Sequence, residues 1–165
     1  MTKPTSTRLR ELLVYDPSTG VFQWKIDVGR WGRIKAGSIA TVVQGPYLKI
    51  RFGDKYEFAH RVVWCYMTGE WPVGEIDHKD RYTMNNRFSN LRDVSRGVNA
   101  QNRAVRQKNN QGGLLGVSWH KKDQKWRARI QTDRKSVYLG EFQTRDAAFE
   151  AYLQAKRKHH VGCTI

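Results

Sequence analysis

Hydrophobic positions in the first part of the chain are spaced as on short helices and strands. Leucines recur at helical spacing after Ser6, a possible N-cap, which predicts a short helix over residues 6–14. Asp, Pro, Ser, Thr and Gly gather at residues 16–20 and predict a turn. Alternating segments predict strands at residues 21–24, 38–43, 47–52 and 56–59. We expect a small antiparallel sheet here, followed by a buried helix over residues 60–68.

The last third of the chain carries a second set of elements. Residues 103–116 combine Asn, Gln and Gly without periodicity, which is typical of a linker or an exposed loop. Short strands are predicted beyond it at residues 117–121, 125–131 and 136–142. A helix is predicted over residues 144–159, with Thr144 as its N-cap. Its apolar face would contain Ala147, Ala148, Ala151, Tyr152 and Ala155.

Together these patterns predict an α+β protein with two domains. The first domain would span residues 1–103, with its most polar and informative segment at residues 75–103. A linker would occupy residues 104–113. The second domain would span residues 114–165 and pack a three-stranded antiparallel sheet on one helix.

The net charge of the chain indicates a binding function in addition to the fold. The 165 residues carry a formal net charge of +15, and the sequence pI is about 10.2. Both parts contribute, because residues 1–103 hold 17 basic and 10 acidic side chains and residues 104–165 hold 13 and 5. A polyanionic partner is therefore expected. A hydrophobic fraction of 39% with six Trp is too high for a disordered polybasic tail.

Other composition signals exclude several classes of protein. No apolar run approaches the roughly 18–20 residues that cross a bilayer, and the first residues do not resemble a signal peptide. We expect no membrane association, no secretion and a cytoplasmic location. Cys65 and Cys163 form no CxxC pair, so neither a zinc cluster nor a disulfide framework is encoded. Any metal must then be held by oxygen and imidazole.

Residues 75–103 carry the clearest candidate chemistry. They are predicted to form a strand, a polar loop, a second strand and a helix, which would bring Asp77, His78, Asn90 and Asn99 together. Carboxylate and amide oxygens suit a hard divalent cation such as Mg²⁺ or Mn²⁺. An imidazole can accept a proton from water at neutral pH. The set therefore predicts a phosphodiester hydrolysis site.

Each of these residues has a role in that hypothesis. His78 would be the general base, and Asp77 and Asn99 would hold the single cation. Asn90 would hydrogen-bond the loop backbone, orient the His78 ring, or both. The alternative is that these residues only form turns and caps and that His78 is structural.

The same segment resembles the HNH endonuclease family, in particular the homing endonucleases of phages and introns. The matching motif consists of Asp77-His78, Asn85-Asn86, Asn90-Leu91-Arg92 and Asn99. The resemblance extends upstream through His60-Arg61 and more loosely over most of residues 8–103. It implies a ββα-metal nuclease site that cleaves DNA with one divalent cation, with Asn99 as the metal ligand in the position of the family's last His.

Several neighbouring residues allow more than one interpretation. Asn85 and Asn86 are better explained by left-handed and turn geometry than as ligands. His60 could contact a phosphate or cap the helix that it begins. Four arginines could contact phosphates or simply face solvent, namely Arg61, Arg81, Arg87 and Arg92.

Alternation in the second domain predicts a basic sheet face. Trp126, Ala128 and Ile130 share one side of a strand, and the opposite side is polar and basic. Such a face suits the major groove, although it could be an ordinary solubilising surface. The candidate DNA-binding residues are His120, Lys122, Arg127, Arg129, Gln131, Arg134, Lys135 and Tyr138. Trp119 and Trp126 are expected to pack within the domain rather than stack on bases.

This second domain resembles the Apetala/ethylene-response-factor type of DNA-binding domain over about residues 114–160. The resemblance is carried by Gly116-Val117-Ser118-Trp119, Trp126, Ala128, Ile130, Tyr138-Leu139-Gly140, Phe142, Thr144, Ala147-Ala148 and Ala151-Tyr152. The plant proteins carry Arg and Trp at base-reading positions where this chain has Ser118, His120, Lys122 and Ser136. The resemblance therefore implies duplex DNA binding without defining a target sequence.

The combined hypothesis is a metal-dependent endonuclease that cuts double-stranded DNA as a monomer, without zinc or an organic cofactor. The first domain would cut and the second would supply most of the specificity. One alternative is a DNA-binding regulator that does not cleave, which would not need the set formed by Asp77, His78, Asn90 and Asn99. An RNA-binding protein would fit the charge but not the paired motifs.

Overall fold

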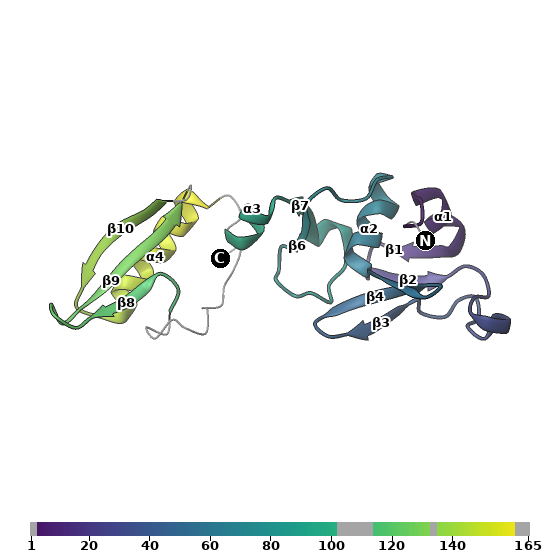
Figure 1. Cartoon of the computed structure of the whole chain (residues 1–165), viewed down its shortest axis with the longest axis horizontal. Coiled ribbons are helices and arrows are strands. Elements are labelled where there is room, and N and C mark those ends of the chain that lie inside the picture. The colour runs from purple at the N-terminus through teal and green to yellow at the C-terminus, as the bar shows by residue number, and fades with distance from the viewer. Residues whose placement is uncertain (1–2, 102–113, 133–134, 161–165) are drawn as a thin grey trace. The chain divides into compact units, whose positions relative to one another are not determined.

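The computed structural model describes residues 3–101, 114–132 and 135–160, and the chain divides into two compact units, Met1–Ser95 and Arg96–Ile165 (Figure 1). The predicted linker at residues 104–113 lies outside the described residues, as do Arg134 and Cys163. Mixed helices and strands in both units confirm the α+β prediction.

The first unit begins with a helix that is shorter than predicted. Helix α1 spans Ser6–Leu12, and Thr5 rather than Ser6 is its N-cap, with Oγ1 accepting from Arg8 N at 3.2 Å. Strand β1, Leu13–Asp16, then pairs antiparallel with β2, Val21–Trp24. The helix ends at Leu12 because the chain gains a strand partner from Leu13 onward.

Three further strands form the small antiparallel sheet that was predicted. They are β3 (Thr41–Gln44), β4 (Tyr47–Phe52) and β5 (Lys55–Phe58), in the order β3-β4-β5. Strand β3 starts three residues later than the predicted residue 38, and Ile39 instead makes an isolated bridge to Gln23. A short 3-10 helix, η1, spans Arg30–Gly32.

Helix α2 and a second hairpin complete the first unit. Helix α2 spans Ala59–Thr68 and ends at Gly69, whose φ of 94° is left-handed. Strand β6 (Glu75–His78) pairs antiparallel with β7 (Leu91–Val94), and the short helix η2 (Phe88–Asn90) leads into β7. The core beneath them contains Leu9, Leu13, Tyr15, Phe22, Trp24, Ala40, Ile50, Ala59, Val62, Val63, Cys65, Ile76 and Leu91. Tertiary packing of this core fixes the ends of the β6–β7 loop.

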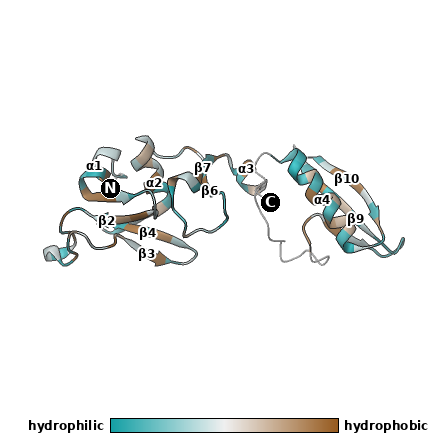
Figure 2. Cartoon of the chain, turned by 180° about the vertical axis from the view of Figure 1, so that it is seen from behind, coloured by the Kyte–Doolittle hydropathy of each residue, from teal (hydrophilic) through white to brown (hydrophobic). Residues whose placement is uncertain are grey.

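The second unit has the predicted sheet and helix. Its strands are β8 (Val117–His120), β9 (Lys125–Thr132) and β10 (Lys135–Phe142), in the order β10-β9-β8. Helix α4 spans Arg145–His159 and packs on this sheet, with Thr144 Oγ1 accepting from Ala147 N at 3.2 Å. Both hydrophilic and hydrophobic stretches occur along β9 and β10, as Figure 2 shows. A short helix, α3 (Arg96–Gln101), is grouped with this unit.

The buried face of α4 differs in part from the predicted one. Ala148 and Tyr152 are buried as expected, but Ala147 is exposed. Lys156, which was not expected on this face, is buried. Gly116 explains how closely the helix approaches the sheet, because a Cβ there would lie 2.1 Å from the Tyr152 ring. None of the described helices is long and apolar enough to cross a membrane.

Candidate active site and nucleic-acid interface

The hairpin of β6 and β7 holds Asp77 and His78 in the interior of the first unit. The two residues are 7% and 4% exposed. Asp77 pairs with Arg92 across the hairpin, and its Oδ2 accepts from Arg92 Nε at 2.8 Å and from Nη2 at 2.6 Å. The guanidinium therefore compensates part of the cost of burying this carboxylate.

One side chain fixes the orientation of the His78 ring. His78 Nε2 and Asn86 Oδ1 are 3.0 Å apart, and Asn86 is only 1% exposed. Because Oδ1 can only accept, this contact favours the tautomer that carries its proton on Nε2. Nδ1 is then the basic nitrogen, and within the described residues it makes no hydrogen bond.

Asn90 organises the loop instead of contacting His78. Its Nδ2 donates to Asp80 Oδ1 and to the Asn85 carbonyl, both at 2.9 Å, and its Oδ1 accepts from Asp80 N at 3.1 Å. Asn85 Nδ2 also donates to Asp80 Oδ2 at 2.7 Å. Although burial acts to raise it, these hydrogen bonds hold the pKa of the Asp80 carboxyl below its usual value. Of the two roles weighed for Asn90, the structure places it in loop support.

The interpretation of Asn85 and Asn86 is right about turn geometry, because Asn85 N donates to the Tyr82 carbonyl at 2.9 Å, but it is wrong about a left-handed backbone. Neither has a positive φ, and the left-handed position of this loop is Arg81, with φ 64°. Asn86 is instead the buried partner of the His78 ring. Sequence spacing gives no signal for this contact, because it depends on how the loop from Lys79 returns toward β6.

His60 packs against the same ring. It lies in the first turn of α2, but the N-cap is Phe58, so His60 does not cap the helix. Its ring stacks on Phe58 with centroids 5.3 Å apart and meets the His78 ring edge-on at 5.2 Å. Burial, followed by the nearby His78 and Arg61, lowers the pKa of His60 to about 3. The His60 ring is therefore uncharged near neutral pH and packs against the His78 ring.

Acid should destabilise the protein through His60. The pKa of His60 is lower in the folded protein than in the unfolded chain. Between about pH 6.5 and the folded-state pKa, the unfolded chain therefore binds a proton that the folded chain does not. The free energy of unfolding consequently decreases as the pH falls through this range. The expected loss is about 2 kcal/mol between about pH 7 and pH 5. Urea unfolding of wild type and His60→Phe at both pH values measures it. Equal losses in the two proteins would contradict the assignment.

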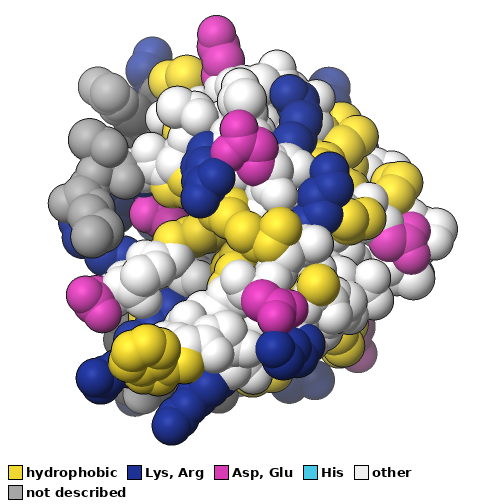
Figure 3. Space-filling model, turned by 90° about the vertical axis from the view of Figure 1, so that its right-hand side faces the viewer, with side chains coloured by type: hydrophobic (Ala, Val, Ile, Leu, Met, Phe, Trp, Pro, Cys, Tyr) yellow, Lys and Arg dark blue, Asp and Glu magenta, His cyan; other side chains and the backbone are white. Residues whose placement is uncertain are grey.

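Most of the candidate phosphate-binding arginines have partners inside the first unit. Arg61 donates to the carbonyls of Gly74 and Pro72 at 3.0 and 3.1 Å. Arg87 donates to the Ser18 carbonyl, and Arg92 binds Asp77 as described. Arg81 is exposed. On the face seen in Figure 3, Lys and Arg side chains lie among hydrophobic and acidic ones rather than in one patch.

The donors proposed for a metal are chemically suitable for a hard cation. Asp77 supplies carboxylate oxygen and Asn99 an amide oxygen, and neither donor is sulfur. Asn99 lies in α3, which is grouped with the second unit. Among the described residues, no three His, Cys, Asp or Glu side chains form a group that could hold a metal ion.

In the second unit the predicted alternation along β9 is observed. Ala128 and Ile130 are buried, and Arg129 and Gln131 are exposed on the opposite side. The Arg129 guanidinium lies 5.9 Å from the centroid of the Tyr138 ring, which is 51% exposed. Lys122 and Lys135 are also exposed. This outer face of the sheet, with Ser118 and Ser136, is the candidate nucleic-acid interface.

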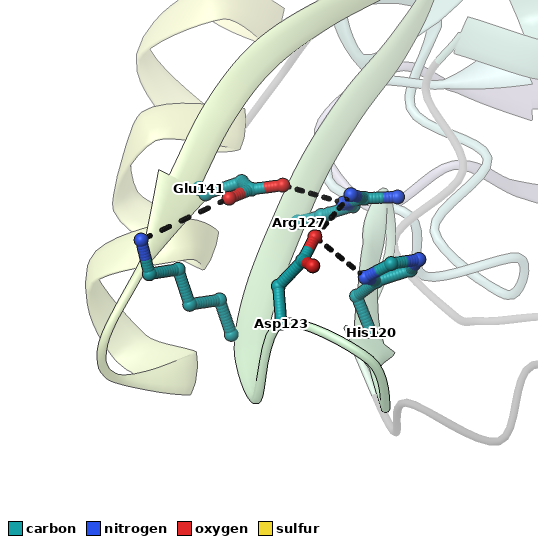
Figure 4. A network of polar contacts seen from close by, with 5 residues as sticks. His120, Asp123, Arg127 and Glu141 are labelled. Carbon is teal, nitrogen blue, oxygen red and sulfur yellow. Dashed lines mark hydrogen bonds and ion pairs between the residues drawn. The ribbon is translucent and has the colours of Figure 1, made fainter.

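Two of the predicted DNA-binding residues lie in a network of polar contacts with carboxylates (Figure 4). Arg127 binds Glu141 Oε1 through Nε and Asp123 Oδ2 through Nη2, each at 2.7 Å. His120 Nδ1 lies 2.8 Å from Asp123 Oδ2. Lys125 Nζ approaches Glu141 Oε2 at 4.0 Å. The carboxylates compensate much of the charge at this end of the interface, which alternation along one strand does not reveal.

The two tryptophans of the sheet pack on each other. Their ring centroids are 5.2 Å apart. Trp126 packs against the core formed around Val117, Ala128 and Ala148, whereas Trp119 is 44% exposed. The expectation of packing is therefore met fully by Trp126 and only in part by Trp119.

Two family models match separate parts of the chain, and the first match includes α3. Residues 57–101 match the family model described as HNH endonuclease, and residues 113–160 match that of the AP2 domain. The chain therefore contains an HNH endonuclease domain, to which the β6–β7 hairpin belongs, followed by an AP2 DNA-binding domain. The HNH and AP2 resemblances seen in the sequence are confirmed over these residues, whereas the looser upstream resemblance lies outside the HNH match. No curated protein and no solved structure matches the chain. The HNH domain supports a nuclease that acts on DNA, and the AP2 domain supports DNA binding.

Proposed function

We propose that this protein is a metal-dependent endonuclease that hydrolyses phosphodiester bonds in double-stranded DNA, with His78 as general base. The observation that carries the proposal is the buried His78 ring, whose Nε2 is held by Asn86 Oδ1 within a segment that matches HNH endonucleases. A general base with a fixed ring and a free basic nitrogen is suited to activating water.

The proton transfer follows from the orientation of the ring. A water molecule would donate a proton to His78 Nδ1 while its oxygen forms a bond to phosphorus and the bond to the leaving oxygen breaks. Nε2 would keep its proton and donate it in a hydrogen bond to Asn86 Oδ1, the two atoms being 3.0 Å apart, so that the resulting imidazolium keeps a hydrogen-bond acceptor. Neutral His60 adds no competing positive charge beside it.

HNH nucleases generally use a divalent metal. Here Asp77 and Asn99 would hold one Mg²⁺ or Mn²⁺, which would supply positive charge to the scissile phosphate and leaving oxygen. Arg92 orients Asp77 through two contacts to one carboxylate oxygen. Asn90 would act by holding the loop around Asp80 in shape.

The AP2 unit is the AP2 domain of residues 113–160. It would bind the duplex with the outer face of its sheet. The proposed contacts come from His120, Lys122, Arg127, Arg129, Gln131, Lys135 and Tyr138, together with Arg134, which lies outside the described residues. Tethering to this unit raises the effective concentration of the nuclease site at bound DNA. By resemblance we further propose a homing role in a phage or its bacterial host, in the cytoplasm, with the protein acting as a monomer.

Two arginines on the same strand provide a test of this interface. Arg129→Gln removes an exposed charge, and we expect about a tenfold loss of duplex affinity with a salt slope shallower by about 1. Arg127→Gln should cost less affinity than Arg129→Gln, because Glu141 and Asp123 already bind the Arg127 charge and leave it a smaller share of the DNA contact. Fluorescence anisotropy across a salt series measures both. Unchanged affinity and salt slope in Arg129→Gln would contradict the proposed interface.

Cleavage in the presence and absence of metal distinguishes the nuclease from a regulator that only binds DNA. The protein is incubated with supercoiled plasmid and with genomic DNA of its source in Mg²⁺, Mn²⁺ or EDTA. Nicked or linear product only with metal supports the nuclease. Tight binding to duplex without product on either DNA would favour the regulator.

A further inference from the structure

A tyrosine far from the HNH segment holds the backbone that carries Asn86. Tyr15 lies on β1 and is buried. Its hydroxyl donates to the Asn86 carbonyl at 2.9 Å and accepts from Phe88 N at 2.9 Å. One hydroxyl thereby makes two hydrogen bonds to the short segment formed by residues 86–88, which lies about 70 positions further along the chain.

The turn that follows β1 presses on the same segment. A Cβ at Gly20 would lie 2.6 Å from Arg87 N and 2.7 Å from the Asn86 carbonyl carbon, so the two backbones are in direct contact. Arg87 Nε also donates to the Ser18 carbonyl. Asp16 accepts hydrogen bonds from Ser18 and Thr19, which lower its pKa and fix the shape of the turn. The β1–β2 hairpin is thus a rigid support for residues 86–88.

The Asn86 side chain depends on this support for its direction. Its Nδ2 is buried and has no hydrogen-bond partner among the described residues, so His78 Nε2 is the one side-chain hydrogen bond that orients the amide there. The direction of Oδ1 is therefore set by the position of the Asn86 backbone. Tyr15 fixes that position through the Asn86 carbonyl and the following Phe88 N–H.

We propose that Tyr15 is a positioning residue for the nuclease reaction, which orients His78 through Asn86. The inference rests on the proposed function of His78. It also assigns a part in the reaction to the β1–β2 hairpin, which lies outside residues 57–101 of the HNH match. A small displacement of a catalytic group can lower a rate by about a hundredfold, so loss of one supporting hydroxyl has a measurable effect.

Tyr15→Phe tests the proposal in the full-length protein. The change removes the hydroxyl and retains the ring that packs on Phe22 and Tyr66. We expect the single-turnover cleavage rate on saturating plasmid to fall about tenfold, with unchanged duplex affinity. The ¹⁵N NMR signals of the His78 ring should also move from the Nε2–H tautomer toward a mixture, which a merely structural defect elsewhere would not cause.

Tyr66→Phe is the matched control. Tyr66 belongs to the same ring cluster, but its hydroxyl reaches only the Leu13 carbonyl, at 3.5 Å. The Tyr66→Phe variant should cleave DNA at the wild-type rate and show the wild-type His78 tautomer. Should Tyr15→Phe fail to fold, 3-fluorotyrosine placed at position 15 alters the hydroxyl with the ring retained, and the same two readouts are expected to change in the same direction.

Two results would overturn the proposal. One is a Tyr15→Phe protein with wild-type rate and an unchanged His78 tautomer. The other is an equal loss in Tyr15→Phe and Tyr66→Phe, which would assign the effect to general packing. Absence of cleavage by wild type would instead contradict the proposed function, and the His78 NMR signals would still decide whether Tyr15 sets the orientation of that ring.

Discussion

Cleavage of duplex DNA is expected to fall about a thousandfold or more when His78 is replaced by alanine. The variant loses the nitrogen that would accept the proton from water, and no other described side chain replaces it at this position. Duplex affinity should stay within about twofold of wild type, because the AP2 unit would supply most of the binding. Cleavage kinetics and anisotropy on the same preparations measure both quantities.

His159→Ala is a suitable control for this experiment. His159 is an exposed residue in the last turn of α4 and belongs to no part of the candidate nuclease site. It should cleave at the wild-type rate. Parallel losses of affinity and cleavage in His78→Ala would show that the substitution disrupts the fold rather than the chemistry.

The second large effect is expected at Asp77. Asp77→Asn preserves the shape of the side chain but removes the charge that would hold the cation and that binds Arg92. Cleavage should fall at least about a hundredfold, and raising Mg²⁺ or Mn²⁺ should not restore it. The free energy of unfolding should fall by about 1–3 kcal/mol, because the ion pair between Asp77 and Arg92 is lost.

Asp93→Asn separates the two parts of that prediction. Asp93 lies on the neighbouring strand of the same hairpin, and its carboxylate accepts from Val73 N and Gly74 N at 2.9 and 2.8 Å. This substitution should lower stability and leave the midpoint of a metal titration unchanged. A metal midpoint that is also unchanged in Asp77→Asn would contradict the role of Asp77 as a ligand.

The fold is predictable from the sequence wherever local pattern and tertiary contacts agree. Strand β4 was predicted at residues 47–52 and is observed there, because hydrophobic alternation and the turns on both sides give the same bounds. The predicted helix over residues 6–14 is longer than the observed α1, because the leucines fit a helix and the following strand equally well. The end of α1 is decided by pairing of β1 with β2, which is not a local property.

The candidate site shows the same limit. The position of Asp77 and His78 on a strand followed from the sequence. The partner of His78 did not, because Asn86 reaches the ring only after the loop is closed by Asn90 and supported from Tyr15. Hydrogen bonds between residues so far apart in the chain leave no periodic signal.

In the second unit the missed feature is a register. Arg127 lies opposite Glu141 because the pairing of β9 with β10 shifts between Tyr138 and Gly140. Gly140 has a φ of 132°, which residues other than glycine rarely adopt. A glycine within a strand often marks such a shift in register. The alternation along β9 alone placed Arg127 on the correct face but could not reveal its carboxylate partners.

The central claim is that this chain cuts DNA with His78 as its base. Single-turnover cleavage of supercoiled plasmid with saturating protein tests it most directly, with wild type and His78→Ala compared in Mg²⁺, in Mn²⁺ and in EDTA. We expect nicked or linear product from wild type in a divalent metal, product formed at least about a thousandfold more slowly by His78→Ala, and none in EDTA, with equal DNA binding by both proteins. Equal cleavage by the two proteins, or no cleavage by fully bound wild type, would contradict it.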